Sequence, residues 1–188
     1  HSFPTRRSSD LIETDFGGFS GSNTMLRIRQ AYVNLDWGKS AVLVGITWHP
    51  LFGAVMPDVL NLSTGAPFQP FNRSPQIRYQ YKANSRVQLT ASVLWQLQYL
   101  SSGPKGMSED YIKNSCIPEM FVGADFTPAD GWLMGLGAHM ISLKPRTSTE
   151  WKELTFKVNE RMTAFSYEAH LKYSGRNYTF AAKTLMAS

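Results

Sequence analysis

The chain has 188 residues, of which 43% are hydrophobic, 13% aromatic and 18% charged, with a net charge of +5 and a single cysteine. One cysteine excludes a disulfide framework and a cysteine-based zinc site, and the aromatic content excludes a disordered chain. No run reaches the ~20 consecutive apolar residues of a membrane-spanning helix, but a transmembrane β-barrel would show the same average composition because its apolar residues alternate with polar ones.

The first residues of the chain show no pattern of a helix, a strand or a signal peptide. Residues 1–11 lack the apolar segment of a signal peptide and show neither a helical nor a strand period. The run resembles translated sequencing-adapter DNA, so we set it aside as a non-native scar and expect the fold to occupy residues 12–188. A weak first strand is expected near Asp15 to Ser20. Because residues 185–188 lie inside another expected strand, we interpret the chain as an internal fragment.

Residues 25–37 form the next expected strand, with Ala31 and Val33 among the residues of its apolar face. Continued towards the start of the strand, this alternation places Arg27 and Arg29 on the apolar side. A charge at the midplane of a bilayer would cost about 2–4 kcal/mol there. Three alternatives stay open: the arginines lie above the hydrocarbon, they face a neighbouring subunit, or a β-bulge shifts the alternation.

The clearest alternation covers residues 86–99, where one face is apolar throughout and the other is polar except at Leu94. Side chains alternate between two faces only in an extended strand. Shorter stretches repeat the pattern, and no comparable helical period occurs. We therefore predict an all-β chain of about nine antiparallel strands. The further strands are expected at residues 41–49, 77–82, 119–127, 132–140, 163–173 and 178–183.

The connections between these strands alternate between short and long. The short ones are rich in turn residues and lie at residues 38–40, 83–85, 128–131 and 174–177. The long ones lie at residues 50–75, 101–117 and 145–161. This order is typical of an up-and-down membrane barrel with short periplasmic turns and long external loops. Aromatic residues near the strand ends would form its two interfacial belts. They are Trp37, Trp132, Tyr173 and Tyr178 beside short turns, and Trp48 and Tyr99 towards the opposite end.

Three stretches carry a family resemblance: RIRQAYVNLDW at residues 27–37, VLVGITW at 42–48 and PFNRSPQIRY at 70–79. They resemble trimeric porins of the Gram-negative outer membrane, of the Bacteroidetes-type and dicarboxylate-channel-like families. The resemblance implies an antiparallel up-and-down transmembrane β-barrel of about 16 strands, to which this chain would contribute about nine. It also implies the cell outer membrane as location, contact with outer-membrane lipid, and a homotrimer in the full-length parent.

Such porins fold one long loop into the lumen. Residues 50–75 are the best candidate for this constriction loop, because the stretch is too apolar for a freely solvated loop and its prolines and glycines disfavour a strand. The alternative is an external loop that covers a neighbouring subunit.

The predicted function is passive diffusion of small hydrophilic or anionic solutes, without enzymatic activity. A channel needs only polar groups along a wet path. Arg73 is the residue that we expect to contact an anion. The candidate pore-lining residues are Arg73, Arg78, Lys82, Arg86, Glu119, Asp125, His139, Glu168, His170, Lys172 and Lys183.

The remaining signals favour structural interpretations. The histidines at positions 49, 139 and 170 lack metal-ligand spacing, and Glu168 with His170 is read as a buried pair or a solvated lumen group. Gly135 and Gly137 would relieve crowding inside the barrel, and Cys116 is an unpaired surface thiol. We predict no catalytic residue, metal or cofactor, and no nucleic-acid partner, because no Lys or Arg run interleaves with aromatics.

Two other functions stay open. One is a soluble, lipocalin-like ligand-binding β-barrel, whose apolar strand faces should point inward. The other is an outer-membrane barrel enzyme, which would need a convergent Ser/His or carboxylate site.

Overall fold

The computed structural model describes residues 7–16, 26–53, 55, 71–97, 100–152 and 154–188. Its main element is one sheet of nine strands, and each strand pairs antiparallel with the next in the order β1-β2-β3-β4-β5-β8-β9-β12-β13. The predicted all-β chain with about nine antiparallel strands is thus confirmed, whereas barrel closure and membrane insertion stay predictions. The strands are β1 (Arg7–Asp15), β2 (Arg27–Asp36), β3 (Ser40–Trp48), β4 (Arg73–Lys82), β5 (Val87–Leu94), β8 (Glu119–Phe126), β9 (Trp132–Leu143), β12 (Met162–Ser174) and β13 (Thr179–Ala187).

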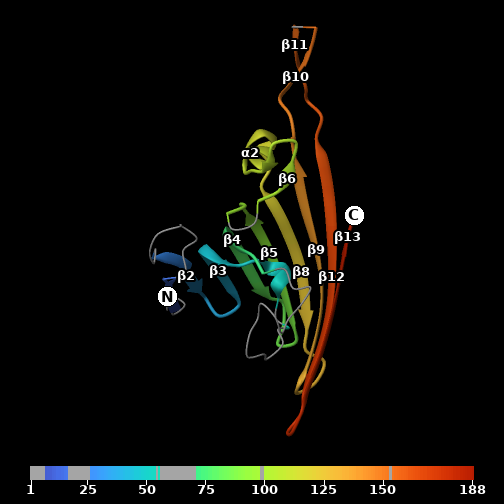
Figure 1. Ribbon diagram of the computed structural model, residues 1–188. Helices are drawn as coiled ribbons and strands as arrows, with labels where there is room; N and C mark the ends of the chain where they lie inside the picture. The colour runs from blue at the N-terminus through green and yellow to red at the C-terminus, as the bar shows by residue number, and fades with distance from the viewer. Residues whose placement is uncertain (1–6, 17–25, 54, 56–70, 98–99, 153) are drawn as a thin grey trace.

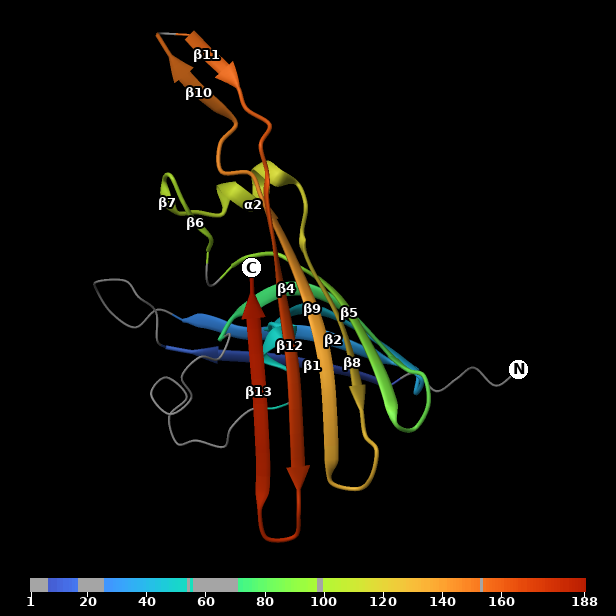
Figure 2. The same cartoon turned by 90° about the vertical axis from the view of Figure 1, so that its right-hand side faces the viewer.

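The sheet is strongly twisted and curved. In Figure 2, β8, β9, β12 and β13 run nearly upright, whereas β1 and β2 cross behind them. We call the inner side of this curve the concave face and the outer side the convex face. A single-turn 3-10 helix, η1 (Pro50–Phe52), follows β3 and packs on the concave face, as the contacts described below show.

The connections follow the predicted alternation. The four short ones join β2 to β3, β4 to β5, β8 to β9, and β12 to β13. The long ones carry small elements that the sequence pattern did not predict: η1, β6 (Ser102–Gly103), β7 (Gly106–Met107), α2 (Asp110–Ser115), β10 (Ser148–Trp151) and β11 (Leu154–Lys157). In Figure 1, α2 and the β10–β11 hairpin lie beyond one end of the sheet, and the short turns of β8–β9 and β12–β13 lie at the other.

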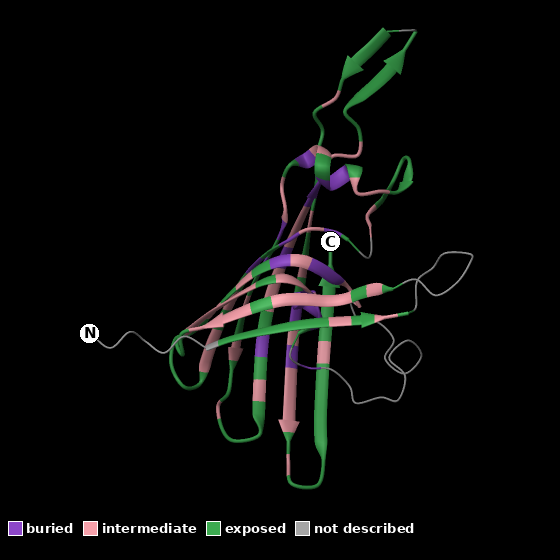
Figure 3. Ribbon diagram, turned by 90° about the vertical axis from the view of Figure 1, so that its left-hand side faces the viewer, coloured by how far each residue is buried: buried purple, intermediate pink, exposed green. Residues whose placement is uncertain are grey.

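The two faces differ in polarity, as the strand alternation predicts. Large apolar side chains alternate along the convex face and are exposed; among them are Val44, Ile77, Leu89, Val93, Val122, Leu136 and Tyr167. Polar side chains on the concave face are instead buried, among them Gln76, Ser92, Glu119, His139, Glu168 and His170. Figure 3 shows buried segments on the middle strands of the curved sheet and also on α2. The sheet therefore covers its polar side chains and exposes its apolar ones.

The first strand differs from the prediction. Strand β1 ends at Asp15, so of the expected strand at residues 15–20 only its first residue is in β1, and residues 17–20 lie outside the described part. Residues 7–11 were expected to be a non-native scar outside the fold. They instead pair with β2, and the last pair at this end joins Arg7 to Asp36. An edge strand needs only backbone hydrogen bonds to its one neighbour, so its side-chain pattern is a weak signal.

Two other strand boundaries also differ. Strand β5 ends at Leu94, short of the predicted residue 99, and residues 98–99 lie outside the described part. Just past the end of β5, the side chain of Gln96 bonds Ser101 and Glu119. Strand β4 starts at Arg73, so residues 73–75 belong to the sheet and not to the predicted loop. Pro75 has no N–H to donate to the sheet, but its carbonyl still accepts a 3.0 Å hydrogen bond from the backbone N–H of Trp95.

The position of Arg27 and Arg29 agrees with the bulge alternative. The register between β1 and β2 shifts after Glu13, which pairs with Gln30, while the next residue of β1 pairs with position 28. Arg29 is therefore the extra residue, and the alternation changes phase at this point. Both arginines form ion pairs with Asp15, Arg27 at 2.6 Å and Arg29 at 2.9 Å, and Arg29 also lies 2.8 Å from Glu13.

Candidate functional site

The candidate site is a cavity on the concave face between η1 and the sheet. Its volume is about 200 Å³, and strands β3, β4, β5, β8, β9 and β12 contribute to its wall. The lining is mixed, with Trp48 and Phe121 beside Arg78, Asp125 and His170. Two buried clusters of histidine and carboxylate side chains border this cavity.

Helix η1 is attached to the concave face by apolar packing and by a lysine. Leu51 packs with Leu94 and Phe121, which are the apolar residues on otherwise polar strand faces. From the far end of the sheet, the Lys183 ammonium donates to the carbonyl oxygens of Leu51 and of Phe52, the latter at 2.9 Å. The described start of residues 50–75 thus lies against the concave face. Residues 54 and 56–70 of the predicted constriction loop lie outside the described part.

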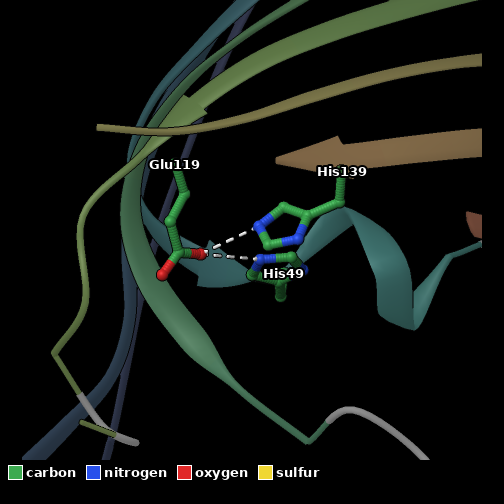
Figure 4. A group of neighbouring side chains, drawn as sticks. All are labelled: His49, Glu119 and His139. Carbon is green, nitrogen blue, oxygen red and sulfur yellow. Dashed lines mark hydrogen bonds and ion pairs between the residues drawn. The ribbon is translucent and has the colours of Figure 1, made fainter. Parts of the chain in front are cut away.

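The first cluster consists of His49, Glu119 and His139. His49 lies between β3 and η1, Glu119 starts β8, and His139 lies in β9. Figure 4 shows both imidazole rings pointing at one carboxylate oxygen. The Nε2 atoms lie 3.3 Å (His49) and 3.1 Å (His139) from Oε2 of Glu119. The other carboxylate oxygen, Oε1, accepts a 2.8 Å hydrogen bond from Gln96. All three side chains are buried, so the carboxylate depends on these donors for its solvation.

The backbone determines the tautomer of His49. Its Nδ1 accepts a hydrogen bond from the Leu51 N–H at 3.2 Å, so the neutral ring carries its proton on Nε2 and donates it to Glu119. Burial lowers the pKa of His49 below its ordinary value, and the hydrogen bond to Glu119 opposes this shift only in part. His49 therefore acts as a neutral bridge between η1 and the sheet.

The second cluster joins three strands of the sheet through His170. Its Nδ1 lies 3.1 Å from Oε2 of Glu168 on the same strand, and its Nε2 lies 3.2 Å from Oδ1 of Asp125 on β8. Strand β9 runs between them, and its partner residue in both pairings is Gly135. A Cβ atom at Gly135 would overlap the His170 ring, and one at Gly137 would lie 2.7 Å from the Phe121 ring. The prediction that these glycines relieve crowding is confirmed.

The two candidate arginines of β4 are held by neighbouring groups. Arg78 borders the cavity and donates to the Trp48 carbonyl at 2.7 Å and to Gln76 at 2.8 Å. Arg73 is buried with its guanidinium 3.9 Å from the Trp48 ring centre. Trp48 itself stacks on Phe52 at 4.5 Å, which differs from its predicted place in an interfacial belt. The arginine that borders the cavity is therefore Arg78, whereas Arg73 packs against the aromatic group beside η1.

The other candidate residues divide between the cavity and the rim. Glu119, Asp125, His139, Glu168, His170 and Lys183 lie in the two clusters or at η1. Lys82 and Arg86 are exposed beside the β4–β5 turn, at a shallow depression that they share with Asp125. Lys172 is half-buried on β12.

At the short-turn end Trp132, Tyr173 and Tyr178 form successive ring contacts at 4.8 and 5.7 Å, and their place in an interfacial belt stays a prediction. Tyr99 lies outside the described residues. Cys116 is a free, exposed thiol, as predicted.

Sequence reasoning missed His49 and Gln96 as site residues. His49 does lie on the predicted polar face of its strand, and this was the only signal available. Its partner Glu119 is separated by 70 positions in the chain, so the contact depends on the curvature of the sheet. The predicted absence of a metal-ligand pattern was based on spacing along the chain, which does not detect ligands contributed by separate strands.

Within the part of the chain that the structure describes, no helix is long and apolar enough to cross a bilayer. No protein-family model and no curated protein sequence matches this chain.

Proposed function

We propose that the curved sheet is part of the wall of a porin in the outer membrane of a Gram-negative cell, through which small hydrophilic solutes diffuse passively. The observation that carries this proposal is the polarity of the two faces. Convex residues such as Val122 and Leu136 are 59% and 68% exposed, while concave residues such as Glu168 and His139 are buried. In a membrane barrel the apolar face contacts lipid and the polar face lines a wet interior.

The dimensions of the strands support a membrane-spanning role. β9 has 12 residues and β12 has 13, and these lengths cover the ~9–11 residues that a tilted strand needs to cross a bilayer. Globular strands usually have ~5–6 residues. The short turns at one end and the long connections at the other fit the same architecture.

The groups around the cavity suggest which solutes would pass. Arg78, Asp125, Glu168 and His170 all line it. Charges of both signs line the same path, so we propose small polar solutes, anions among them, without a sharp preference for one sign of charge. Helix η1 narrows this path, which is the role that the resemblance implies for the long loop.

A closed barrel would need additional strands beyond the nine of the described sheet. β1 and β13 are the two edges of the described sheet, and a barrel has no free edges. A parent barrel of about 16 strands, assembled as a homotrimer, would provide the rest of the wall.

The face polarity weighs against a soluble lipocalin-like barrel, in which the apolar faces would point inward. In this sheet the buried side chains of the concave face include Glu119, His139 and Glu168. An outer-membrane barrel enzyme is the second alternative, with His170 and Glu168 as its candidate pair. Hydrolysis that is lost on replacing either residue would favour it over a channel.

The deciding experiment is reconstitution of the full-length parent protein in planar lipid bilayers. We expect stepwise conductance, and we expect an Arg78→Gln variant to shift the reversal potential in a salt gradient towards cation preference. A matched Arg176→Gln variant, in the exposed β12–β13 turn, should leave that potential unchanged. Absence of conductance steps from correctly folded, membrane-inserted protein would contradict the proposal.

A further inference from the structure

We propose that His49, Glu119 and His139 form a binding site for a divalent transition-metal ion of the zinc type. The site is independent of solute diffusion, because it depends only on the geometry of these three side chains. Two imidazoles and one carboxylate are donors that zinc commonly binds in proteins.

The spacing of the donor atoms suits a single ion. Each of the three residues offers one ligand atom, and these atoms lie within 4.8 Å of one another. The two histidine nitrogens lie 3.3 and 3.1 Å from the shared carboxylate oxygen of Glu119. In a tetrahedral zinc site with bonds of about 2.0–2.1 Å, neighbouring ligands are about 3.3 Å apart. The two nitrogen–oxygen distances therefore already match those of a tetrahedral zinc site.

The surroundings orient the carboxylate as a metal ligand. Gln96 donates to Oε1 of Glu119 at 2.8 Å and leaves Oε2 directed at the histidines. Gln96 is itself held by Ser101, whose backbone N–H donates to it at 3.0 Å. Outer hydrogen bonds of this kind are a regular feature of metal sites. The strand positions of Glu119 and His139 in one sheet give the site a rigid base.

The protons on the two histidines respond differently to a metal. Coordination through Nε2 requires the ring proton to move to Nδ1. The Nδ1 atom of His139 is buried and has no hydrogen-bond partner among the described residues, so it can accept the proton. The Nδ1 atom of His49 accepts a hydrogen bond from the Leu51 N–H at 3.2 Å, and that hydrogen bond must break before Nδ1 can carry the proton. A neutral imidazole that binds in this way keeps its one proton, so coordination by such a ring releases none.

Metal binding would therefore affect η1. His49 caps this helix through the hydrogen bond from Leu51, and coordination would release that cap. Three protein ligands leave a fourth position for water or a solute, and His49 also borders the cavity. The ion would thus lie at the junction of the sheet, η1 and the solute path.

The other cluster provides a matched control. His170 contacts Glu168 through Nδ1 and Asp125 through Nε2, so its two carboxylates are on opposite sides of the ring. No single ion can replace both contacts. A His170→Gln variant removes a buried imidazole beside carboxylates without touching the proposed ligands.

The test is a cobalt titration of the 188-residue chain folded in detergent micelles, followed by absorbance. His1→Ala and Cys116→Ser are present in every protein to remove other binding groups. We expect the visible bands of four-coordinate Co²⁺, which Zn²⁺ should displace stoichiometrically. His139→Ala and Glu119→Gln should weaken binding at least ~10–100-fold, and Gln96→Ala should weaken it less than either. His170→Gln should bind as the parent does.

Folding is followed in parallel by circular dichroism, and only variants with the parent's strand signal are compared. Absence of the bands would overturn the proposal. So would equal affinity in His139→Ala, Glu119→Gln and the parent, because binding would then lie elsewhere. Weakening in His170→Gln equal to that in His139→Ala would overturn it too. Each of these results is independent of conductance, so the metal site and the proposed channel can fail separately.

Discussion

His170 on β12 contacts Asp125 on β8 at 3.2 Å although a whole strand separates them. The contact is possible because the strand between them, β9, has Gly135 at the crossing point. A glycine has no side chain above the backbone, so the imidazole lies directly over it. The sequence pattern of one strand thus determines a contact between two others.

The first prediction is that Gly135→Ala breaks this contact. The added Cβ would overlap the imidazole ring and move it off Asp125. Overpacking of this kind costs about 1–3 kcal/mol, so the unfolding midpoint in urea should fall. The control is Leu136→Met, a change of similar volume on the convex face of the same strand. An unchanged midpoint for Gly135→Ala would show that β9 can move away from His170.

The second prediction concerns the attachment of η1. Lys183 donates to the carbonyls of Leu51 and Phe52, and hydrogen bonds to a charged group contribute about 1.5–3 kcal/mol. Since Lys183 is only half-buried, we expect the lower part of that range. Lys183→Met should speed amide hydrogen exchange in η1 about tenfold, as read by mass spectrometry of peptides that cover residues 50–52.

The control for this measurement is Lys172→Met, which removes a half-buried lysine from the neighbouring strand. Exchange in η1 should stay at the parent rate in this variant, and exchange in β9 should stay slow in both. If Lys183→Met left η1 as protected as in the parent, the apolar packing of Leu51 alone would hold it.

The third prediction is a pH dependence of stability that His49 causes. Its pKa is lowered in the folded chain, mainly by burial, so below about pH 6.5 the unfolded chain binds a proton that the folded chain does not. Stability from this group is therefore complete above that pH and declines as the pH falls. The slope for one proton is at most about 1.4 kcal/mol per pH unit.

This dependence can be isolated by comparing the parent with His49→Gln, both with EDTA, between pH 8 and pH 5. The free energy of unfolding of the parent should fall relative to that of the variant as the pH drops below 6.5. Titrating groups that do not interact with His49 behave alike in both proteins and cancel in the difference. A difference that is constant over this range, or that grows in favour of the parent at acid pH, would contradict the lowered pKa.

Much of the fold was predictable because strand alternation is a local property. The four short turns, the three long connections and the polar faces that bear Glu119, His139 and Glu168 all follow from nearest-neighbour patterns. The prediction was less accurate where tertiary contacts override the pattern. Strand β5 ends at Leu94, before the local alternation does, and the side chain of Gln96 just beyond it bonds Glu119, a residue 23 positions away.

The clusters of the candidate site were not predictable in the same way. The sequence placed His49, His139 and Glu119 on the correct face of their strands but gave no register between β3 and β8, which are separated by two other strands. The curvature of the sheet and the turn into η1 bring His49 to Glu119. Only Glu168 and His170 were expected as a pair, because two positions on one strand share a face without any tertiary information.

The proposed channel requires the convex face to contact lipid and the concave face to contact water. Leu89 and Thr90 test it as a matched pair, because they are adjacent in β5 and lie on opposite faces; Leu89 is exposed and Thr90 borders the cavity. Each is replaced by Cys in a Cys116→Ser background and reacted with a charged thiol reagent in phospholipid vesicles. Samples unfolded in urea show the extent of labelling of each cysteine when it is fully accessible, and serve as the reference.

We predict that Thr90→Cys reacts in vesicles and Leu89→Cys stays protected, with both reacting fully after unfolding. Reaction of Leu89→Cys as fast as that of Thr90→Cys in vesicles would contradict the claim that the convex face contacts lipid.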